Sequence, residues 1–165
     1  MNTLDFSTKA IIESSIERIE EILTTGVLVQ PTAQNHIFHN SAFIELLILL
    51  RDLMYKTESY ATRVSFTYDV LLGAQVKDVT DLIKYMRDAL CHRESNNHVL
   101  DKTRGWTVTF CSIRGKGSLA RFGDLVLQSE YSDDICYFFG AQKIYLFRHI
   151  IRAFQESKAQ LLPLL

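Results

Sequence analysis

Residues 106–128, WTVTFCSIRGKGSLARFGDLVLQ, interrupt a chain whose other long segments follow a helical pattern. The stretch from Trp106 to Arg114 alternates in polarity and is rich in β-branched and aromatic residues, and Leu119 to Gln128 has the same character. The Gly-rich segment GKGS lies between them, which predicts two short strands joined in a β-hairpin. We therefore expect one hairpin, at about 106–128, inserted in a helical protein.

The segments on either side of this hairpin predict helices, because their apolar residues recur every three or four positions. The expected helices are Ser7–Thr25, about Ala33–Lys56, about Val76–Cys91 and about Tyr145–Leu161. The stretch ICYFFGAQ, which follows Asp133 and Asp134, indicates neither a helix nor a strand. The expected fold class is mainly α, an up-and-down helical bundle with a β-hairpin before its last helix, and residues 1–165 form one domain.

Composition and charge narrow the class of protein. The chain has 165 residues with a formal net charge of -1, and its 47% hydrophobic and 22% charged residues are typical of a soluble globular protein. Residues 1–60 hold four Lys/Arg against eight Asp/Glu, whereas residues 61–165 hold fourteen against eleven. The mildly basic second part permits a phosphate-bearing partner such as RNA, although a solvated surface without function has the same pattern.

Cysteine usage and hydropathy predict a location. Cys91, Cys111 and Cys136 have no metal-ligand spacing, and an odd number of cysteines without a signal peptide favours reduced thiols. The most apolar stretch, AFIELLILL at 42–50, contains Glu45 and is much shorter than the roughly 20 residues that a membrane span needs. We expect a cytoplasmic protein that has no membrane partner.

Most familiar enzyme motifs are missing: the sequence has no GxSxG, HExxH, GxGxxG or CxxC. His36 and His39 could hold a metal only with two further ligands, which nothing nominates, and histidines bonded to backbone or solvent near a helix start are the simpler interpretation. The segment RGKGS at 114–118 lacks the spacing of a phosphate-binding loop and favours a turn. We expect no metal and no cofactor.

One candidate site remains, in the stretch KYMRDALCHRES at 84–95. Arg87 and His92 have the spacing RxxxxH at the end of the third expected helix, and Asp88 follows the arginine. On a helical wheel Arg87 flanks the apolar stripe, whereas Tyr85, Asp88 and His92 lie on the opposite side and can reach solvent or a partner. Ordinary polar residues on the solvated side of a helix end would look the same.

The segment MRDALCH resembles the RxxxxH motif of the HEPN superfamily, the higher eukaryote and prokaryote nucleotide-binding domain, in which a polar residue follows the arginine. The expected bundle with the motif late in a core helix is similar to the fold of that family. The resemblance implies a metal-independent endoribonuclease, a toxin or phage-defence component, in which a ribose 2′-hydroxyl attacks the adjacent phosphate. It also implies a homodimer with a composite site and, for a toxin, an antitoxin protein as partner.

The resemblance assigns His92 as acid or base, Arg87 as the stabiliser of the phosphate and Asp88 as the residue that orients one of them. Histidine titrates near neutral pH and arginine binds phosphate oxygens, so both residue types suit this chemistry. Glu94 stands where some members carry a tyrosine that a nucleotidyltransferase antitoxin modifies, so that form of control is not expected. The cations that could guide RNA are Arg93, Lys102, Arg104 and Arg114, with Trp106 to stack on a base.

Two alternative interpretations give these residues no catalytic role. Many HEPN domains are inert modules for dimerisation or for binding a ligand or partner. An unrelated helical bundle with Arg87 and His92 on its surface is the other.

Overall fold

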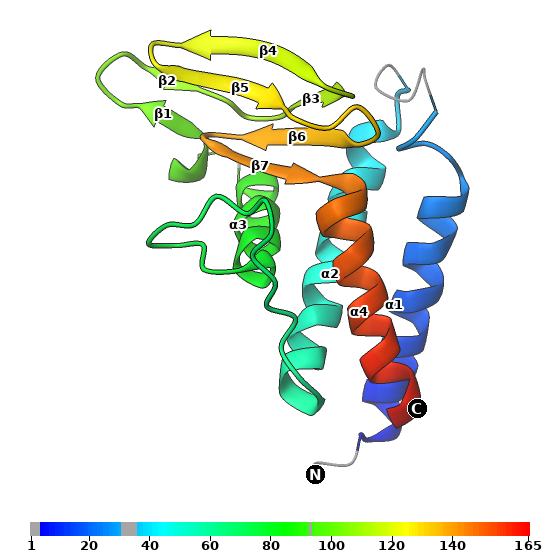
Figure 1. Ribbon diagram of the computed structural model, residues 1–165. Coiled ribbons are helices and arrows are strands. Elements are labelled where there is room, and N and C mark those ends of the chain that lie inside the picture. The colour runs from blue at the N-terminus through cyan, green and yellow to red at the C-terminus, as the bar shows by residue number, and fades with distance from the viewer. Residues whose placement is uncertain (1–3, 31–35, 93) are drawn as a thin grey trace. The chain divides into compact units, whose positions relative to one another are not determined.

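The computed structural model describes residues 4–30, 36–92 and 94–165 (Figure 1). It is 49% helical and 19% strand, with four helices and a β region of several sheets. The expectation of a mainly α bundle is therefore wrong, and the fold is mixed α/β. The error arose because a single hairpin was expected where residues 99–145 hold seven strands.

The chain folds into two compact units. The first, which we call the helical unit, consists of Met1–Phe66 and Arg152–Leu165. The second, which we call the α+β unit, is the continuous segment Thr67–Ile151. The candidate residues of the RxxxxH motif all belong to the α+β unit.

Three helices form the helical unit: α1 (Phe6–Thr24), α2 (His39–Tyr60) and α4 (Arg152–Leu161). α2 contacts both α1 and α4. Asp5 caps α1, since its carboxylate accepts a hydrogen bond of 2.7 Å from the backbone N–H of Thr8. α2 has more buried residues than α1 or α4, as its dense apolar sequence predicted, and its fully buried apolar side chains include Phe43, Leu46, Leu47, Leu50 and Leu53.

The α+β unit combines α3 (Val79–Cys91) with seven short antiparallel strands. β1 (Val99–Asp101) pairs with β2 (Trp106–Thr107), and β4 (Gly117–Phe122) pairs with β5 (Leu125–Ser129). β3 (Cys111–Arg114), β6 (Ile135–Phe139) and β7 (Gln142–Tyr145) form a three-stranded sheet in the order β3-β6-β7. Figure 1 shows these strands in yellow-green to orange.

The pairing of β3 differs from the expected hairpin. Cys111 lies opposite Phe138 and Arg114 opposite Ile135, so β3 pairs with β6, whereas β4 turns back at Gly123 to pair with β5. The hairpin expected around GKGS is therefore wrong. Alternating polarity identifies a half-buried strand but not its partner. β6 is apolar along its whole length and all five of its residues are buried, so it lacked the alternation that would have predicted it.

A hydrophobic core joins the strands of the α+β unit. Its buried members are Val108, Leu127, Cys136, Phe138 and Tyr145, and the partly buried side chains packed against them include Ile113, Ala120, Phe122 and Leu125. A short 3₁₀ helix, η2 (Asn96–His98), connects α3 to β1 and contacts α3. After β7 the chain forms a π-helical turn, η3 (Leu146–Ile151), in place of the first part of the expected last helix. η2 therefore lies against α3 and helps to fix its surroundings.

Candidate functional site

α3 presents the candidate residues, and its sequence explains where it starts and stops. The carboxylate of Asp78 accepts a hydrogen bond of 2.9 Å from the backbone N–H of Asp81, which caps the first turn. This cap starts the helix three residues later than the expected Val76. The last helical residue is Cys91, and His92 has an extended backbone.

His92 consequently lies just beyond the helix, and its assignment to one face of a helical wheel is wrong. Its backbone N–H still donates to the carbonyl of Asp88 at 3.2 Å, which holds its main chain one turn above Asp88. The His92 side chain is exposed, and no residue in the described part of the chain hydrogen-bonds to its imidazole. The ring is therefore free to meet a ligand.

Arg87 and Asp88 form an ion pair within one protomer. Arg87 Nη1 lies 3.0 Å from Asp88 Oδ1, and the two side chains are 34% and 38% exposed. Arg87 Nε is buried and has no hydrogen-bond partner among the residues that the structure describes. The guanidinium thus has one partner from its own chain and part of its surface open to solvent.

A polar cavity of about 440 Å³ lies beside Asp88. One face of α3 supplies four of its lining residues, and the rest come from the segments before and after the helix; the lining is Gln75, Asp81, Lys84, Tyr85, Asp88, Ser95 and Asn97. Tyr85 Oη donates to the carbonyl of Asn97 at 3.0 Å, and Asn97 Nδ2 donates to the carbonyl of Tyr85 at 3.3 Å. This reciprocal pair fastens the segment after α3 to the helix, and burial raises the pKa of Tyr85 above its usual value.

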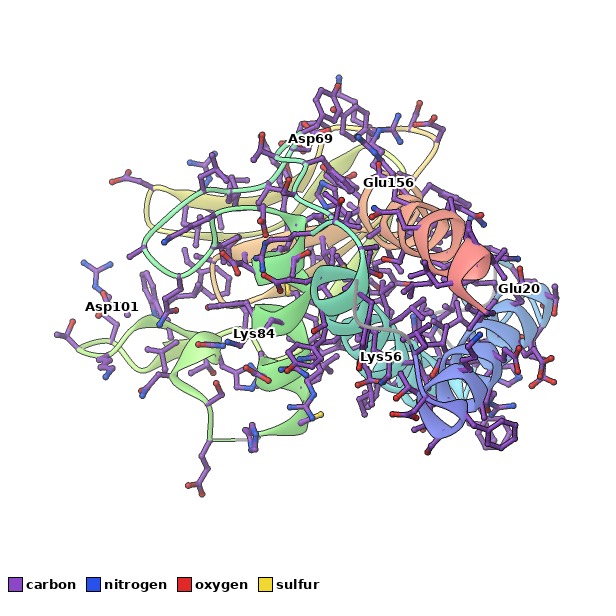
Figure 2. All side chains as sticks on the ribbon, turned by 90° about the horizontal axis from the view of Figure 1, so that it is seen from below. Glu20, Lys56, Asp69, Lys84, Asp101 and Glu156 are labelled. Carbon is purple, nitrogen blue, oxygen red and sulfur yellow. The ribbon has the colours of Figure 1, made fainter. Side chains whose placement is uncertain are left out.

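The described cations that were expected to guide RNA lie on two different elements. Lys102 and Arg104 share the exposed turn between β1 and β2, whereas Arg114 ends β3. Arg93 lies outside the described residues. Figure 2 labels Lys84 on α3 and Asp101 at the end of β1, and the two stand apart in this view. Of the expected site residues, Arg87 and Asp88 are in contact, and Lys102 and Arg104 are in one turn.

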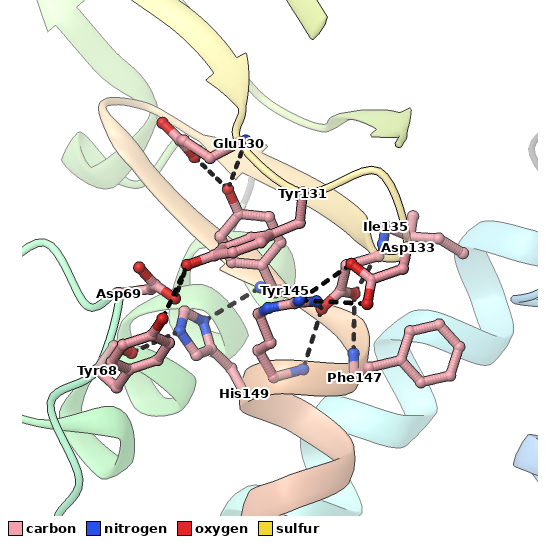
Figure 3. A network of polar contacts seen from close by, with 11 residues as sticks. Tyr68, Asp69, Glu130, Tyr131, Asp133, Ile135, Tyr145, Phe147 and His149 are labelled. Carbon is pink, nitrogen blue, oxygen red and sulfur yellow. Dashed lines mark hydrogen bonds and ion pairs between the residues drawn. The ribbon is translucent and has the colours of Figure 1, made fainter. Parts of the chain in front are cut away.

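A polar network around the buried Asp134 was missed by sequence analysis (Figure 3). The side chain of Asp134 is fully buried and accepts hydrogen bonds from the backbone N–H groups of Phe147 at 2.9 Å and Arg148 at 3.1 Å. The Arg148 guanidinium lies 3.0 Å from Asp134 and 2.9 Å from Asp133, and it stacks 3.6 Å above the ring of Tyr131. Asp134 therefore joins the start of β6 to the first turn of η3.

The same network continues to Tyr68 and Asp69. Tyr131 Oη donates to Asp69 Oδ2 at 2.6 Å, which raises the pKa of Tyr131 above its usual value. Asp69 has a left-handed backbone with φ 59°, a conformation that Asp tolerates better than most residues. His149 is fully buried: its Nδ1 accepts from the N–H of Tyr145 at 3.2 Å, and its Nε2 lies 3.0 Å from the carbonyl of Tyr68. These residues all belong to the α+β unit and bond to one another, so we infer that the network stabilises this unit. The adjacent pair Asp133-Asp134 before an apolar run was its only signal in the sequence.

The two histidines considered for a metal are bonded to backbone. His36 Nδ1 accepts from the N–H of Phe38 at 3.2 Å, and His39 Nδ1 lies 3.1 Å from the carbonyl of Val27. Within residues 4–30, 36–92 and 94–165, no group of three or more His, Cys, Asp or Glu side chains could hold a metal ion. In those same ranges no helix is long and apolar enough to cross a membrane.

Comparison with known proteins adds no relative. No protein-family model, no curated protein and no solved structure matches this chain. We therefore argue its function from the residues at the end of α3.

Proposed function

We propose that this protein is a metal-independent endoribonuclease whose site lies at the C-terminal end of α3. The observation that carries the proposal is the exposed imidazole of His92 directly after a helix whose last turns carry the ion pair of Arg87 and Asp88. The mainly α bundle forms no part of the proposal, because that fold was wrong. The resemblance to HEPN proteins now rests on these three residues.

The chemistry assigns a separate task to each residue. His92 takes the proton from a ribose 2′-hydroxyl, or gives one to the leaving 5′-oxygen, as the hydroxyl attacks the adjacent phosphate. Arg87 donates hydrogen bonds to the phosphate oxygens, where negative charge increases in the transition state. The products are a 2′,3′-cyclic phosphate and a free 5′-hydroxyl. All of this is done by side chains of the protein.

When RNA binds, the ion pair between Asp88 and Arg87 must be broken in part. Its ion pair is more than one-third exposed on the Asp88 side, and exposed pairs of this kind are weak. A phosphate can therefore reach the part of the guanidinium that is open to solvent, since the Arg87 side chain is 34% exposed. Asp88 then keeps the planar group oriented from one side.

A single pair of Arg87 and His92 offers one histidine where the reaction needs both a base and an acid. Two protomers that bring their α3 ends together supply two histidines, so we propose a homodimer with a composite site. We place the protein in the cytoplasm, where Cys91, Cys111 and Cys136 stay reduced as free thiols. A toxin or phage-defence role, with an antitoxin as partner, is part of this proposal.

The second candidate function is an inert module that binds a ligand or partner at this surface. The ion pair favours it, since Arg87 already has a partner in its own chain. It predicts binding without cleavage.

The test is cleavage of single-stranded RNA in EDTA by the wild type, Arg87→Ala and His92→Ala. Matched controls are Arg121→Ala and His36→Ala, which remove an exposed arginine and an exposed histidine elsewhere. Light scattering must show that each variant has the same oligomeric state as the wild type. We expect the two site variants to cut at least about 100-fold more slowly, a typical effect of losing one such group, and the controls to cut normally. Equal cleavage by all five proteins rejects the proposal.

A further inference from the structure

The tips of two hairpins in the α+β unit meet around the only tryptophan of the sequence, Trp106. The rings of Trp106 and Phe122 have centroids 5.7 Å apart at an interplanar angle of 57°, and the guanidinium of Arg104 lies 4.7 Å above the indole. A Cβ built on Gly123 would contact both Trp106 and Arg104. We call Lys102, Arg104, Trp106 and Phe122 the hairpin-tip surface; Figure 1 shows the β1–β2 and β4–β5 turns that carry it.

We infer that the hairpin-tip surface binds single-stranded RNA by stacking a base on Trp106. This inference rests on the proposed ribonuclease and names how its substrate is held. A cluster of aromatic rings beside exposed cations is an arrangement that accepts unpaired bases and their phosphates without reading their sequence. Paired bases cannot stack in this way, so the surface selects single strands.

Trp106 contacts Phe122 on one side and is covered by the guanidinium of Arg104 on another. Phe122 packs against the hydrophobic core of the strands, which fixes the ring that Trp106 contacts. Arg104 covers the indole, but its side chain is 59% exposed. Its ion pair with Asp101 is long, at 3.6 Å. A base can therefore replace the guanidinium on the indole while Arg104 moves to a phosphate.

Charge in the β1–β2 turn fits a nucleic-acid backbone. Asp101 holds the turn by accepting hydrogen bonds from the N–H groups of Thr103 at 2.8 Å and Arg104 at 3.2 Å. Its carboxylate is thereby occupied, and the exposed side chains of the turn that carry charge are the cations of Lys102 and Arg104. Two cations contacting two phosphates predict that log Kd changes with log salt with a slope of about 1.4, since each phosphate on a single strand contributes about 0.7.

The intrinsic fluorescence of Trp106 reports this surface directly, because the sequence holds no second tryptophan. The titrant is a short 2′-O-methyl oligouridylate, which lacks the attacking hydroxyl and so separates binding from cleavage. We expect saturable quenching by this single strand and none by the same strand in a duplex. A duplex that quenches equally, or an acidic polyglutamate that quenches as strongly as the oligouridylate, overturns the inference.

Variants locate the binding. Arg104→Ala should weaken binding and lower the salt slope by about 0.7, whereas the matched control Arg121→Ala, on the neighbouring hairpin, should change neither. Trp106→Leu, followed by anisotropy of labelled oligonucleotide and checked by circular dichroism, should weaken binding about 5- to 150-fold, the usual effect of losing one stacked base. Binding by anisotropy with an unchanged Trp106 signal means that RNA binds elsewhere and overturns the inference.

The inference and the proposed function fail separately. His92→Ala should retain full quenching of Trp106 while losing cleavage. Quenching by a wild type that never cuts RNA supports the hairpin-tip surface and rejects the nuclease. Cleavage at the wild-type rate by Arg104→Ala and Trp106→Leu, with unchanged affinity, supports the nuclease and rejects the surface.

Discussion

Asp133 and Asp134 are neighbours that pair with the same arginine, yet their replacement should have very different effects on stability. Arg148 lies 2.9 Å from Asp133 and 3.0 Å from Asp134. The Asp133 side chain is 71% exposed, whereas that of Asp134 is fully buried and also accepts two backbone N–H groups of η3. We predict that Asp134→Asn destabilises the protein strongly and that Asp133→Asn hardly does.

The magnitude follows from the partners. A hydrogen bond to a charged group contributes about 1.5–3 kcal/mol and a neutral one about 0.5–1.5 kcal/mol. Asp134→Asn keeps the shape but removes the charge and one acceptor oxygen, so we expect the free energy of unfolding to fall by about 2–4 kcal/mol. Asp133→Asn removes only an exposed ion pair, which contributes about 0–1 kcal/mol.

Urea denaturation followed by circular dichroism measures both changes. The midpoint for Asp134→Asn should decrease with little change in the slope m, because the folded state buries the same surface. In a thermal scan, a loss of this size corresponds to a decrease in Tm of roughly 4–16 °C. Equal midpoints for the two variants would refute the reasoning that burial and the contacts to η3 distinguish these aspartates.

Three further predictions concern other residues of the α+β unit. Burial lowers the pKa of His149, so the imidazole binds a proton more readily in the unfolded chain than in the folded one. The free energy of unfolding should therefore fall as pH decreases below about 6.5. Urea titrations at several pH values should show that His149→Gln reduces this dependence. Burial raises the pKa of Cys136 to about 12, so a thiol reagent at neutral pH should label the exposed Cys91 quickly and Cys136 only on unfolding, as peptide mass mapping would show. Gly140→Ala would place a Cβ 2.1 Å from the carbonyl oxygen of Asn97 at a φ of 54°, so it should cost at least about 1–3 kcal/mol in the same denaturation assay.

Helical periodicity predicted both ends of α1 and α3 within three residues, because each buries one side only. α2 begins at His39 and ends four residues beyond the expected Lys56, and its expected start at Ala33 lies outside the described residues. β6 escaped prediction because all five of its residues are buried, which leaves no alternation to detect. The pairing of β3 with β6 joins segments more than twenty residues apart, and nothing in either segment alone specifies that partner.

The candidate site was predicted in part. The predicted polar side of α3 near Asp88 is present and lines a cavity. The contact of Arg87 with Asp88 could be predicted because the two residues are adjacent in the sequence. The end of α3 at Cys91 was predicted, but His92 was placed on the helical wheel although it lies one residue beyond that end, where its backbone is extended. Trp106 was proposed to stack on RNA, but its contact with Phe122 depends on two hairpins that sequence alone did not pair correctly.

The central claim is that a ribose 2′-hydroxyl is the nucleophile and that His92 and Arg87 assist it. The most direct measurement uses a DNA oligonucleotide that contains a single ribonucleotide, incubated with the wild type in EDTA. We predict one cut, on the 3′ side of that ribonucleotide, which leaves a 2′,3′-cyclic phosphate detectable by mass spectrometry and is lost in His92→Ala and Arg87→Ala. Cleavage at deoxynucleotides, or an intact oligonucleotide at every protein concentration, would contradict the claim.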